Sequence, residues 1–593
     1  MNITMKKSLV IILSLLLSSS LVMRAADVAV YFVDGDNWSA VNVYQWGDNG
    51  QAAGWPGTAM NLTNTASNKG AVFQLTVNDS YPYIIFNHGN TQSEDMCLVA
   101  ETPYYYKGAW YASMEAINDY VEPTDSEVGV PSESEDVILQ VFYWDSYKNN
   151  SKYGDTKWQT LAGQVNDIVP YFSMVWFPPS ASSAGGVGYH PADYSNQSSD
   201  WGVKMYLRQL LEAFHEQNTK VIADIVINHA ANKSSWCDFY TQNFGSYGTF
   251  TPTAAWIPRT DEVNTSASGS CKGKATGAAD DGYGASANWA GARDWDHVNP
   301  EVQAMFKAYL QWMKNEVHYD GWRYDYCKGF ASGHISDYNL ASEPEISIME
   351  YWDEGDVQNE INHVNLAQKN SMVFDFYMRA AALKKIASGS YSSLKNAGMR
   401  GKGYERYAVT FVDNHDTFAR GDGNATDVAN KKDGSSINNA ALILQANAYI
   451  LAMPGIPCVF YPHWVIYMVP IRDMVKARRI AGIHSQSTVE EESGSGYYKA
   501  TITGKHGSVK LFLGKNSGYD TCPAGYQPAY VGNDVGYYFQ GDGAWPREGV
   551  SIDLSAVEEV KQPVEIKGQK ILDNGQLLIK VGDKTYNALG QEL

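Results

Sequence analysis

The sequence has few cysteines and no basic excess, and these two absences exclude several classes of protein. Six cysteines are spread over 593 residues, without the close pairs typical of a zinc site. The formal net charge of −20 argues against a nucleic-acid partner, which requires a basic surface. Charged residues make up 19% and hydrophobic residues 44% of the chain, so we expect globular domains rather than disorder.

Long apolar runs are also scarce, and the one clear example is N-terminal. It covers residues 9–23, follows two lysines and precedes the small residues Ala25 and Ala26. This order is typical of a signal peptide, so we expect residues 1–26 to be removed. No later run is apolar enough to span a membrane. The sequence thus predicts a secreted, cell-surface or periplasmic protein without a transmembrane segment, and it leaves the oligomeric state open.

Export permits disulfides but does not establish any. Cys237 and Cys271 fall within one inserted stretch of the chain, and the sequence leaves open whether they pair. Cys458 lies in the apolar run "IPCVFY", which predicts a buried free thiol.

Changes in composition divide the chain into domains. Residues 27–121 hold short strand-like runs separated by Gly, Asn, Asp and Pro, which predicts a β-sandwich. Residues 122–135 are acidic and contain Ser and Pro, as a linker does. Residues 481–550 return to strand-like runs and predict a C-terminal β-sandwich. Residues 551–593 form a tail with a predicted hairpin and a weak resemblance to surface-sorting segments.

Between these parts, residues 136–480 alternate eight apolar strand-like runs with amphipathic stretches such as "VKMYLRQLLEAFHEQN". Eight such units predict an α/β fold, a closed (β/α)8 TIM barrel of parallel strands. A long insertion after the third strand, about residues 230–294, is rich in Gly, Ala, Ser and Asp. An insertion of this length in a compact domain predicts a functional subdomain.

The active site of such a barrel lies at the C-terminal ends of its strands. Four of the strand-like runs end in carboxylates beside a cation, an amide or an imidazole. These residues are Asp224, Asn228 and His229 after the third run, Arg323, Asp325 and Lys328 at the fourth, Glu350 at the fifth, and Asp413, Asn414, His415 and Asp416 at the seventh. Their recurrence in barrel order predicts one shared catalytic site.

The spacing of these residues indicates glycosidic chemistry. Arg323 and Asp325 are two positions apart on a strand, so both side chains point the same way. The guanidinium is expected to lower the pKa of Asp325 and keep it ionised, as a nucleophile requires. Glu350 lies among apolar residues, which should raise its pKa, as a general acid requires. The alternative is that Arg323 and Asp325 form a purely structural salt bridge.

The segments "DIVINH", "GWRYDYCKG", "MEYWD" and "FVDNHD" resemble, in order, the four signature regions of the α-amylase family, glycoside hydrolase family thirteen. The resemblance covers about residues 136–540 and is closest to plant-type members. It implies that Asp325 is the nucleophile, Glu350 the acid/base and Asp416 a third carboxylate that stabilises the transition state.

The same resemblance implies substrate contacts and a metal. The implied substrate-binding residues are Tyr189, His190, His229, Arg323, Lys328 and His415, whereas Asp413 and Asn414 are expected to be structural. It also implies a calcium ion between the barrel and the insertion, held by Asn228, Asp294 and a backbone carbonyl near Gly329. Asp280, Asp281 and Asn288 remain open as further ligands.

The N-terminal stretch "VNVYQWGDNGQAAGWPGTAM" resembles starch-binding modules of carbohydrate-binding family twenty-six. Strand alternation puts Tyr44 and Trp46 on one face, where they predict a platform for a glucan chain. The alternative is that one or both lie in the core, and Trp55 is interpreted as structural. The linker predicts that this module folds and acts independently of the barrel.

Taken together, the residues and the resemblance predict an exported retaining α-amylase that cuts internal α-1,4-glucosidic bonds of starch and related α-glucans. Two alternatives remain at this stage. One is a maltogenic or transglycosylating member of the same family, and the other is an inactive starch-binding protein. The carboxylates at all three catalytic positions, together with Arg323, argue against the inactive form.

Overall fold

The computed structural model describes residues 27–261, 273–283, 291–418 and 440–550, apart from positions 48, 49, 90, 100, 101, 150, 152, 186, 234, 236, 547 and 549, and the backbone of three strands within 569–587. The predicted signal peptide, Cys271 and Asn288 lie outside the described residues. The chain divides after Trp545 into two compact units. The second unit holds one antiparallel sheet of β31 (Gln569–Asp573), β32 (Gln576–Val581) and β33 (Lys584–Asn587).

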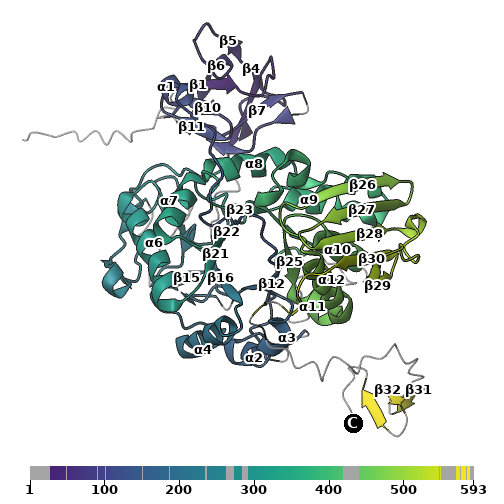
Figure 1. Cartoon of the computed structure of the whole chain (residues 1–593). Helices are drawn as coiled ribbons and strands as arrows, with labels where there is room; N and C mark the ends of the chain where they lie inside the picture. The colour runs from purple at the N-terminus through teal and green to yellow at the C-terminus, as the bar shows by residue number, and fades with distance from the viewer. Residues whose placement is uncertain are drawn as a thin grey trace, which may run out of the picture. The chain divides into compact units, whose positions relative to one another are not determined.

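The N-terminal module is a β-sandwich, as predicted (Figure 1). One sheet has the order β11 (Ala109–Tyr111), β10 (Tyr104–Tyr106), β1 (Asp27–Asp34), β6 (Ala71–Asn78) and β5 (Asn61–Leu62). The other has the order β3 (Gly50–Gln51), β2 (Asn42–Gly47), β7 (Tyr83–His88) and β8 (Thr91–Gln92), with β4 (Thr58–Ala59) and β9 (Met96–Cys97) at its edges. A short helix, α1 (Met114–Asn118), follows.

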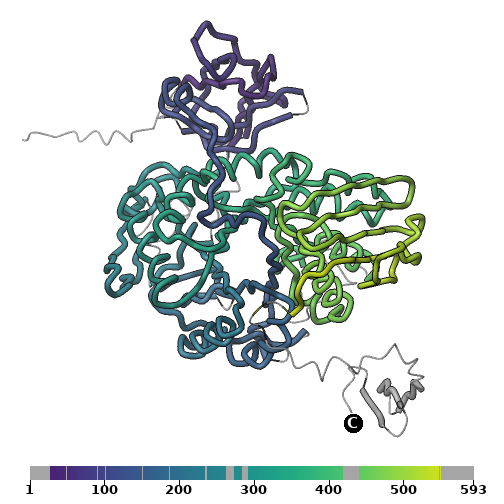
Figure 2. Tube along the Cα trace, viewed as in Figure 1, coloured from purple at the N-terminus to yellow at the C-terminus, as the bar shows by residue number. Residues whose placement is uncertain are grey.

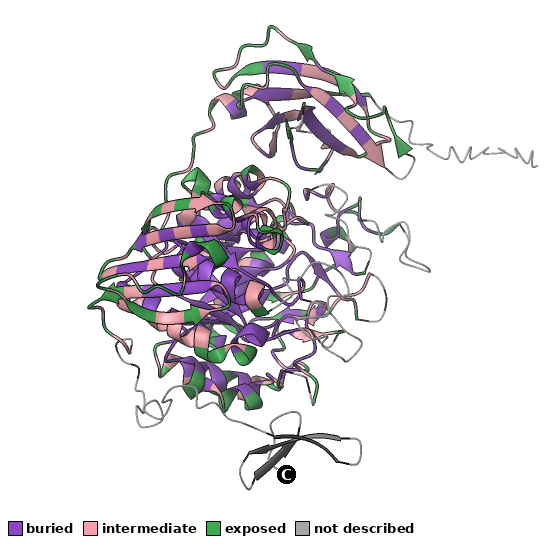
Figure 3. Cartoon of the chain, turned by 90° about the vertical axis from the view of Figure 1, so that its right-hand side faces the viewer, coloured by how far each residue is buried: buried purple, intermediate pink, exposed green. Residues whose placement is uncertain are grey.

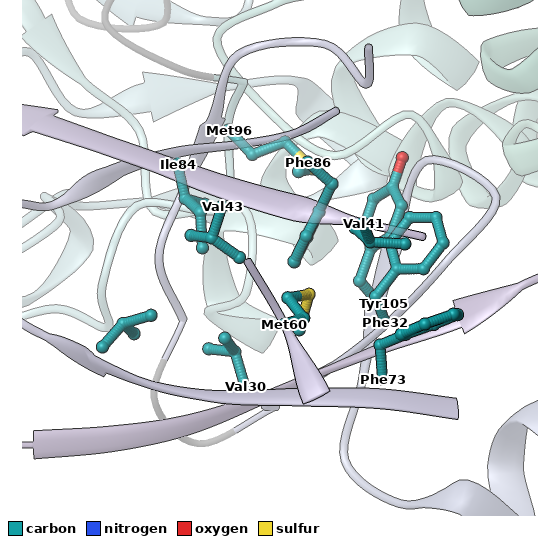
Figure 4. Close-up of a cluster of buried hydrophobic side chains, with 11 residues drawn as sticks. Val30, Phe32, Val41, Val43, Met60, Phe73, Ile84, Phe86, Met96 and Tyr105 are labelled. Atoms are coloured by element: carbon teal, nitrogen blue, oxygen red, sulfur yellow. The ribbon is translucent and has the colours of Figure 1, made fainter. Parts of the chain in front are cut away.

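The two sheets of this module share one hydrophobic core (Figure 4). Val30 and Phe32 of β1 face Val43 of β2 and Ile84 and Phe86 of β7. The residues come from alternate positions of each strand, because successive strand side chains point to opposite faces. The module therefore has a core of its own.

Eight parallel strands close into a barrel, which confirms the predicted fold (Figures 1 and 2). They are β12 (Ile138–Gln140), β13 (Met174–Trp176), β16 (Lys220–Ile225), β21 (Gly321–Tyr324), β22 (Ile346–Met349), β23 (Met372–Phe374), β24 (Ala408–Phe411) and β25 (Ile456–Phe460). Every residue of these strands except Lys220 is buried, since helices cover the outside of the barrel and side chains fill its interior.

The helices around the barrel are α2 (Trp158–Ala162), α3 (Val165–Ile168), α4 (Lys204–His215), α6 (Pro300–Trp312), α7 (Gly333–Ser342), α8 (Val357–Leu366), α9 (Phe376–Ala381), α10 (Ala440–Ala452), α11 (Tyr461–Ile466) and α12 (Met468–Ala481). Helix α4 buries Leu207, Leu210, Leu211 and Phe214, the spacing of one helical face. Helix α6 begins where the Asn299 side chain accepts a hydrogen bond from the Glu301 amide.

The inserted subdomain begins and ends in one antiparallel pair. In it β17 (His229–Ala230) lies beside β20 (Arg293–Asp294), with His229 opposite Asp294. Between them lie β18 (Gln242–Asn243) and β19 (Thr249–Phe250), and before them β14 (Ser182–Ser183) pairs with β15 (Pro191–Asp193). Cys237 in the insertion is disulfide-bonded, whereas Cys458 is a buried free thiol, as predicted.

The C-terminal β domain is one five-stranded antiparallel sheet. Its order is β26 (Thr488–Gly494), β27 (Tyr497–Thr503), β28 (Gly507–Leu513), β30 (Val535–Gly541) and β29 (Gln527–Gly532). Alternate residues of β27, namely Tyr498, Ala500 and Ile502, are buried (Figure 3). Helices α10 and α12 pack against the sheet. The predicted β domain is thus present, but helices form its second layer where the sequence predicted a second sheet.

The segment predicted as a linker is packed against the barrel. Val130 is fully buried, and the Gly129 amide donates to Pro344 O while its carbonyl accepts from the Ser347 amide. Nη2 of Arg406 donates to the carbonyls of Ser126 and Val130, at 2.8 and 2.9 Å. Composition predicted a linker, and these contacts hold its residues 126–130 at the N-terminal ends of the barrel strands.

Candidate active site

The centre of the candidate site is the fully buried Arg323 on β21, which contacts three carboxylates. Its Nη1 donates to Asp224 Oδ1 at 2.9 Å and to Asp325 Oδ1 at 2.7 Å. Its Nη2 lies 2.5 Å from Glu350 Oε1. One guanidinium therefore holds the two residues that the sequence predicted as nucleophile and acid, each through a different nitrogen.

The register of the barrel explains this meeting. Asp224 on β16 pairs directly with Arg323 on the neighbouring strand β21. Asp325 follows two positions after Arg323, so its side chain points the same way. Glu350 directly follows β22, the strand on the other side of β21. Three adjacent parallel strands thus bring the carboxylates together at the C-terminal end of the barrel, which is where this fold places an active site.

Burial controls the charge of this cluster. Removal from water raises the pKa of Asp224 and of Asp325 to about 6, and it also raises the pKa of Glu350. The Arg323 guanidinium opposes each of these shifts. The sequence predicted a lowered pKa for Asp325. That prediction was wrong, because burial and the neighbouring Asp224 carboxylate outweigh the single positive charge.

The sequence placed Asp224 at a strand end but assigned no role to it. The carboxylate interrupts the apolar strand "KVIADI", and an ionisable group within a buried strand indicates a required partner. It is fully engaged here: Oδ2 accepts from Trp176 Nε1 at 3.1 Å and from the Tyr189 hydroxyl at 2.9 Å. Asp224 therefore links Arg323 to the aromatic wall of the site.

That wall consists of three nearly parallel rings. The Tyr189 and His415 ring centroids are 5.1 Å apart with planes 4° apart. Trp144 lies 5.9 Å from Tyr189 with planes 2° apart. Trp144 was not among the predicted residues, although it stands just after the first barrel strand in "VFYWD", where an aromatic can face the site. Parallel flat rings of this kind suit contact with a sugar ring.

The loop after β24 carries His415 and Asp416. Gln140 Nε2 lies 3.0 Å from His415 Nδ1, and an amide nitrogen can only donate, so Nδ1 is assigned as the acceptor and Nε2 as the protonated nitrogen. That nitrogen lies 3.1 Å from Asp416 Oδ2. The side chain of Asp416 keeps 20% of its exposure, so this carboxylate is more open than Asp325 or Glu350.

Asp413 and Asn414 are structural, as predicted. Buried Asp413 accepts from Arg379 Nη2 at 2.6 Å and from the Thr417 hydroxyl at 2.9 Å. The Asn414 side chain accepts from the amides of Asp416 and Thr417, at 2.9 and 2.8 Å. These bonds hold the loop in the shape that presents His415 and Asp416.

The other predicted substrate residues lie around this centre. His229 is buried, and burial lowers its pKa to about 4, so the ring is neutral. Its Nε2 donates to Tyr189 O at 2.9 Å, which supports Tyr189 from behind. The ring of half-buried His190 lies 6.4 Å from that of His229. Lys328 Nζ lies 3.6 Å from Asp353 Oδ2.

The residues predicted to bind calcium lie together and fit an oxygen-bound cation. Asn228 Nδ2 donates to Asp294 Oδ1 at 3.2 Å. The buried Asn228 Oδ1 has no hydrogen-bond partner among the described residues. A Cβ at Gly329 would lie 1.6 Å from that oxygen, so only glycine allows the backbone so close. Amide, carboxylate and carbonyl oxygens are the ligands that calcium prefers.

Two of the three additional calcium ligands left open by the sequence, Asp280 and Asp281, have other partners here, and the third, Asn288, lies outside the described residues. Asp281 lies 2.8 Å from His334 Nε2, and Asp280 Oδ1 accepts from the Gly282 amide at 2.9 Å. Within the described residues there is no group of three or more His, Cys, Asp or Glu that could hold a metal. The candidate calcium site therefore depends on Asn228, Asp294 and the backbone at Gly329.

A second candidate site lies on β2 of the N-terminal module. Tyr44 and Trp46 are partly exposed and stack at 5.6 Å with planes 28° apart. Val43, just before Tyr44, and Gln45, between the two aromatics, are buried and point inward. Neither aromatic therefore belongs to the core. Trp55, interpreted from sequence as structural, is 53% exposed and stands edge-on to Tyr44 at 5.4 Å. The platform thus has three aromatic residues rather than two.

Comparisons with known proteins agree with both domains. The family described as "Starch-binding module 26" matches residues 30–97, and the family "Alpha amylase, catalytic domain" matches residues 143–375. "Probable alpha-amylase 2" of Arabidopsis thaliana is 28% identical over 66% of this chain and 90% of its own length. "Alpha-amylase 3, chloroplastic" of the same plant is 27% identical over 62% of this chain and 40% of its own length.

A bacterial relative, "Glucan 1,4-alpha-maltotetraohydrolase" of Stutzerimonas stutzeri, is 26% identical over 65% of this chain and 69% of its own length. The matched families, the closed barrel and the carboxylate cluster agree with one another. The chain is therefore a glycoside hydrolase with an α-amylase catalytic domain, and it carries a starch-binding module of family 26 at its N-terminal end.

Proposed function

We propose that this protein is an exported retaining α-amylase that hydrolyses internal α-1,4-glucosidic bonds of starch and related α-glucans. The observation that carries the proposal is the clamp of one guanidinium on two carboxyls, Asp325 and Glu350. A retaining glycosidase needs such a close pair, one group to attack the sugar and one to protonate the leaving oxygen. The α-amylase names of the relatives support the choice of substrate.

In the first step, Glu350 donates a proton to the glycosidic oxygen while Asp325 attacks the anomeric carbon. Burial raises the pKa of Glu350, which favours the protonated form that the donor requires. Asp325, with a pKa of about 6, is ionised at neutral pH. In the second step, Glu350 takes a proton from water, which displaces Asp325 and restores the α configuration.

The remaining residues hold the sugar. Asp416 and His415 form a donor and acceptor pair for hydroxyl groups at the cleavage point, and Tyr189 offers its ring face to the same sugar. Lys328 and His190 lie farther out and bind neighbouring sugars or their hydroxyls. His229 supports this wall through its bond to the Tyr189 carbonyl.

Calcium, when bound by Asn228, Asp294 and the Gly329 carbonyl, supplies a positive charge that cross-links the insertion to the barrel. Asn228 follows β16, Asp294 lies in β20 of the insertion and Gly329 follows β21. The ion would therefore secure the ends of the strands that carry Asp224, Arg323 and Asp325.

The platform of Tyr44, Trp46 and Trp55 binds starch, and residues 1–26 direct export. Described residues include no helix that is both long and apolar enough to cross a membrane.

We expect Glu350→Gln and Asp325→Asn each to reduce kcat on maltoheptaose by roughly 10²–10⁴, because each removes a group that acts in the transition state. The matched control is Glu345→Gln. Glu345 directly precedes β22, at the opposite end of the strand from Glu350, and pairs at the surface with Lys220. NMR of the first product should show the α anomer. Near-normal turnover by either variant, or a β product, would contradict the mechanism.

The acidic limb of the pH dependence of kcat/KM should reflect the protonation of the Asp325 carboxylate. Below a pH of about 6, kcat/KM should fall about tenfold per unit, because protonated Asp325 cannot attack. Asp224→Asn should move this acidic limb to lower pH, since the Asp224 charge raises the pKa of Asp325. Rates on maltoheptaose measured from about pH 4 to 8 test this. A limb that stays in place or moves to higher pH would show that Asp224 does not control the nucleophile.

Removal of calcium should lower the melting temperature. A ligand that binds only the folded state stabilises it by about 4 kcal/mol when its concentration is about 1,000 times Kd. Chelation should lower Tm in the natural protein, and added calcium should restore it where magnesium does not. Asn228→Leu should abolish the response to calcium. An unchanged melting curve after metal removal verified by elemental analysis would disprove the site.

Tyr44→Ala combined with Trp46→Ala should weaken binding to granular starch at least about tenfold, because the stacking faces are lost. The matched control is Tyr31→Ala with Tyr104→Ala. These two rings also stack, at 4.5 Å, but on the other sheet of the module. Sedimentation with starch granules measures both. Equal binding by the two double variants would show that this platform is not the starch site.

A further inference from the structure

One carboxylate of the N-terminal module is buried against the barrel and contacts Tyr351, the residue that follows Glu350. Glu94, between β8 and β9, is 5% exposed. Its Oε2 accepts a hydrogen bond from His363 Nε2 at 2.6 Å and another from the Tyr351 hydroxyl. His363 lies in α8, and Tyr351 directly follows Glu350. The starch-binding module thus reaches the loop that carries the acid.

The partners of Glu94 are packed tightly together. The rings of Tyr351 and His363 stack with centroids 3.6 Å apart, and both side chains are fully buried. Tyr283 of the inserted subdomain stands edge-on to His363 at 4.3 Å. Ser332, at the start of α7, contacts His363 Nδ1 at 2.7 Å through its hydroxyl. The module, the insertion and two catalytic loops therefore meet around one carboxylate.

Tyr351, which Glu94 contacts, also has neighbours in the proposed active site. Lys328 Nζ lies 4.9 Å above the Tyr351 ring, so the position of this ring affects a predicted substrate contact. The Glu350 amide donates to Tyr324 O at 2.9 Å, and the Glu350 carbonyl accepts from the Cys327 amide at 3.2 Å. A shift of Tyr351 would be transmitted to Glu350 through the peptide bond that joins them.

Loss of the Glu94 carboxylate would leave buried donors without acceptors. The Tyr351 hydroxyl and His363 Nε2 both use Oε2, and a buried donor that loses its partner moves toward another acceptor or toward water. The other oxygen, Oε1, is buried and has no hydrogen-bond partner among the described residues. A glutamine could therefore keep the accepting oxygen in place and put its amide nitrogen in the position of Oε1.

We propose that Glu94 is a positioning residue for the catalytic acid Glu350, and that the starch-binding module is consequently part of the catalytic unit. This inference rests on the proposed role of Glu350 as the acid. It replaces the sequence-based prediction of a module that acts independently of the barrel. A contact that only docked the module would not need to end on the residue next to the acid.

The test compares Glu94→Ala and Glu94→Gln in the full chain on two soluble substrates. Maltoheptaose has a poor leaving group and depends on protonation by Glu350. α-Maltotriosyl fluoride loses fluoride with little need for that proton. We expect Glu94→Ala to reduce kcat on maltoheptaose at least about tenfold with KM nearly unchanged, since a displacement of about 1 Å can cost roughly 10²-fold. The loss of kcat/KM on the fluoride, which reports the first step alone, should be much smaller than the loss of kcat/KM on maltoheptaose, and Glu94→Gln should restore part of the rate.

Glu115→Ala is the matched control, because Glu115 is an exposed glutamate of the same module, in α1. Thermal unfolding of each variant checks that it is folded. Equal losses of kcat/KM on the two substrates, or an unchanged kcat on maltoheptaose, would overturn the positioning role. Glu350→Gln measured in parallel separates the two proposals. If that variant keeps its rate on maltoheptaose, the proposed function itself is wrong, whatever Glu94 does.

Discussion

The buried guanidinium of Arg323 is the constraint on which the site depends. A charge removed from water is strongly unfavourable unless it is paired, and Arg323 is paired with Asp224, Asp325 and Glu350. Three carboxylates around one cation leave an excess of negative charge. Burial disfavours this charge and therefore raises the pKa of the carboxyl groups. The same cluster that stabilises the cation thus contains a carboxyl with a raised pKa, Glu350, beside a potential nucleophile. Stability and chemistry have one electrostatic origin here.

The barrel makes this cluster possible because it brings distant parts of the sequence into register. Asp224 and Arg323 are 99 positions apart, yet they are direct partners across β16 and β21. The long insertion between them leaves and returns through a single antiparallel pair, β17 and β20. The candidate calcium ligands Asn228 and Asp294 lie at this junction.

Contacts between the N-terminal module, the linker and the barrel also involve buried charged side chains. Residues predicted to form a flexible linker pack on the N-terminal ends of the barrel strands, and Glu94 of the starch-binding module packs at the opposite, catalytic end. A composition rich in Ser, Pro and acidic residues indicates a linker only while its partners are unknown. Here Arg406 and the edge of β22 satisfy its backbone groups. The module is accordingly connected to the catalytic domain by hydrogen bonds and packing as well as by the covalent chain.

The sequence by itself determined the sandwich, the eight barrel units, and the residues Arg323, Asp325, Glu350 and Asp416, because strand periodicity and short ordered motifs are local properties. It also placed Tyr44 and Trp46 on an open face through simple alternation. Only the tertiary structure decided the raised pKa of Asp325, the contact of Asp224 with Arg323, the inclusion of Trp144 and Trp55, and the contact of Glu94 with the barrel. Each of these depends on burial or on neighbours far away in the chain, and no local pattern records how many carboxylates will share one cation once the strands have closed.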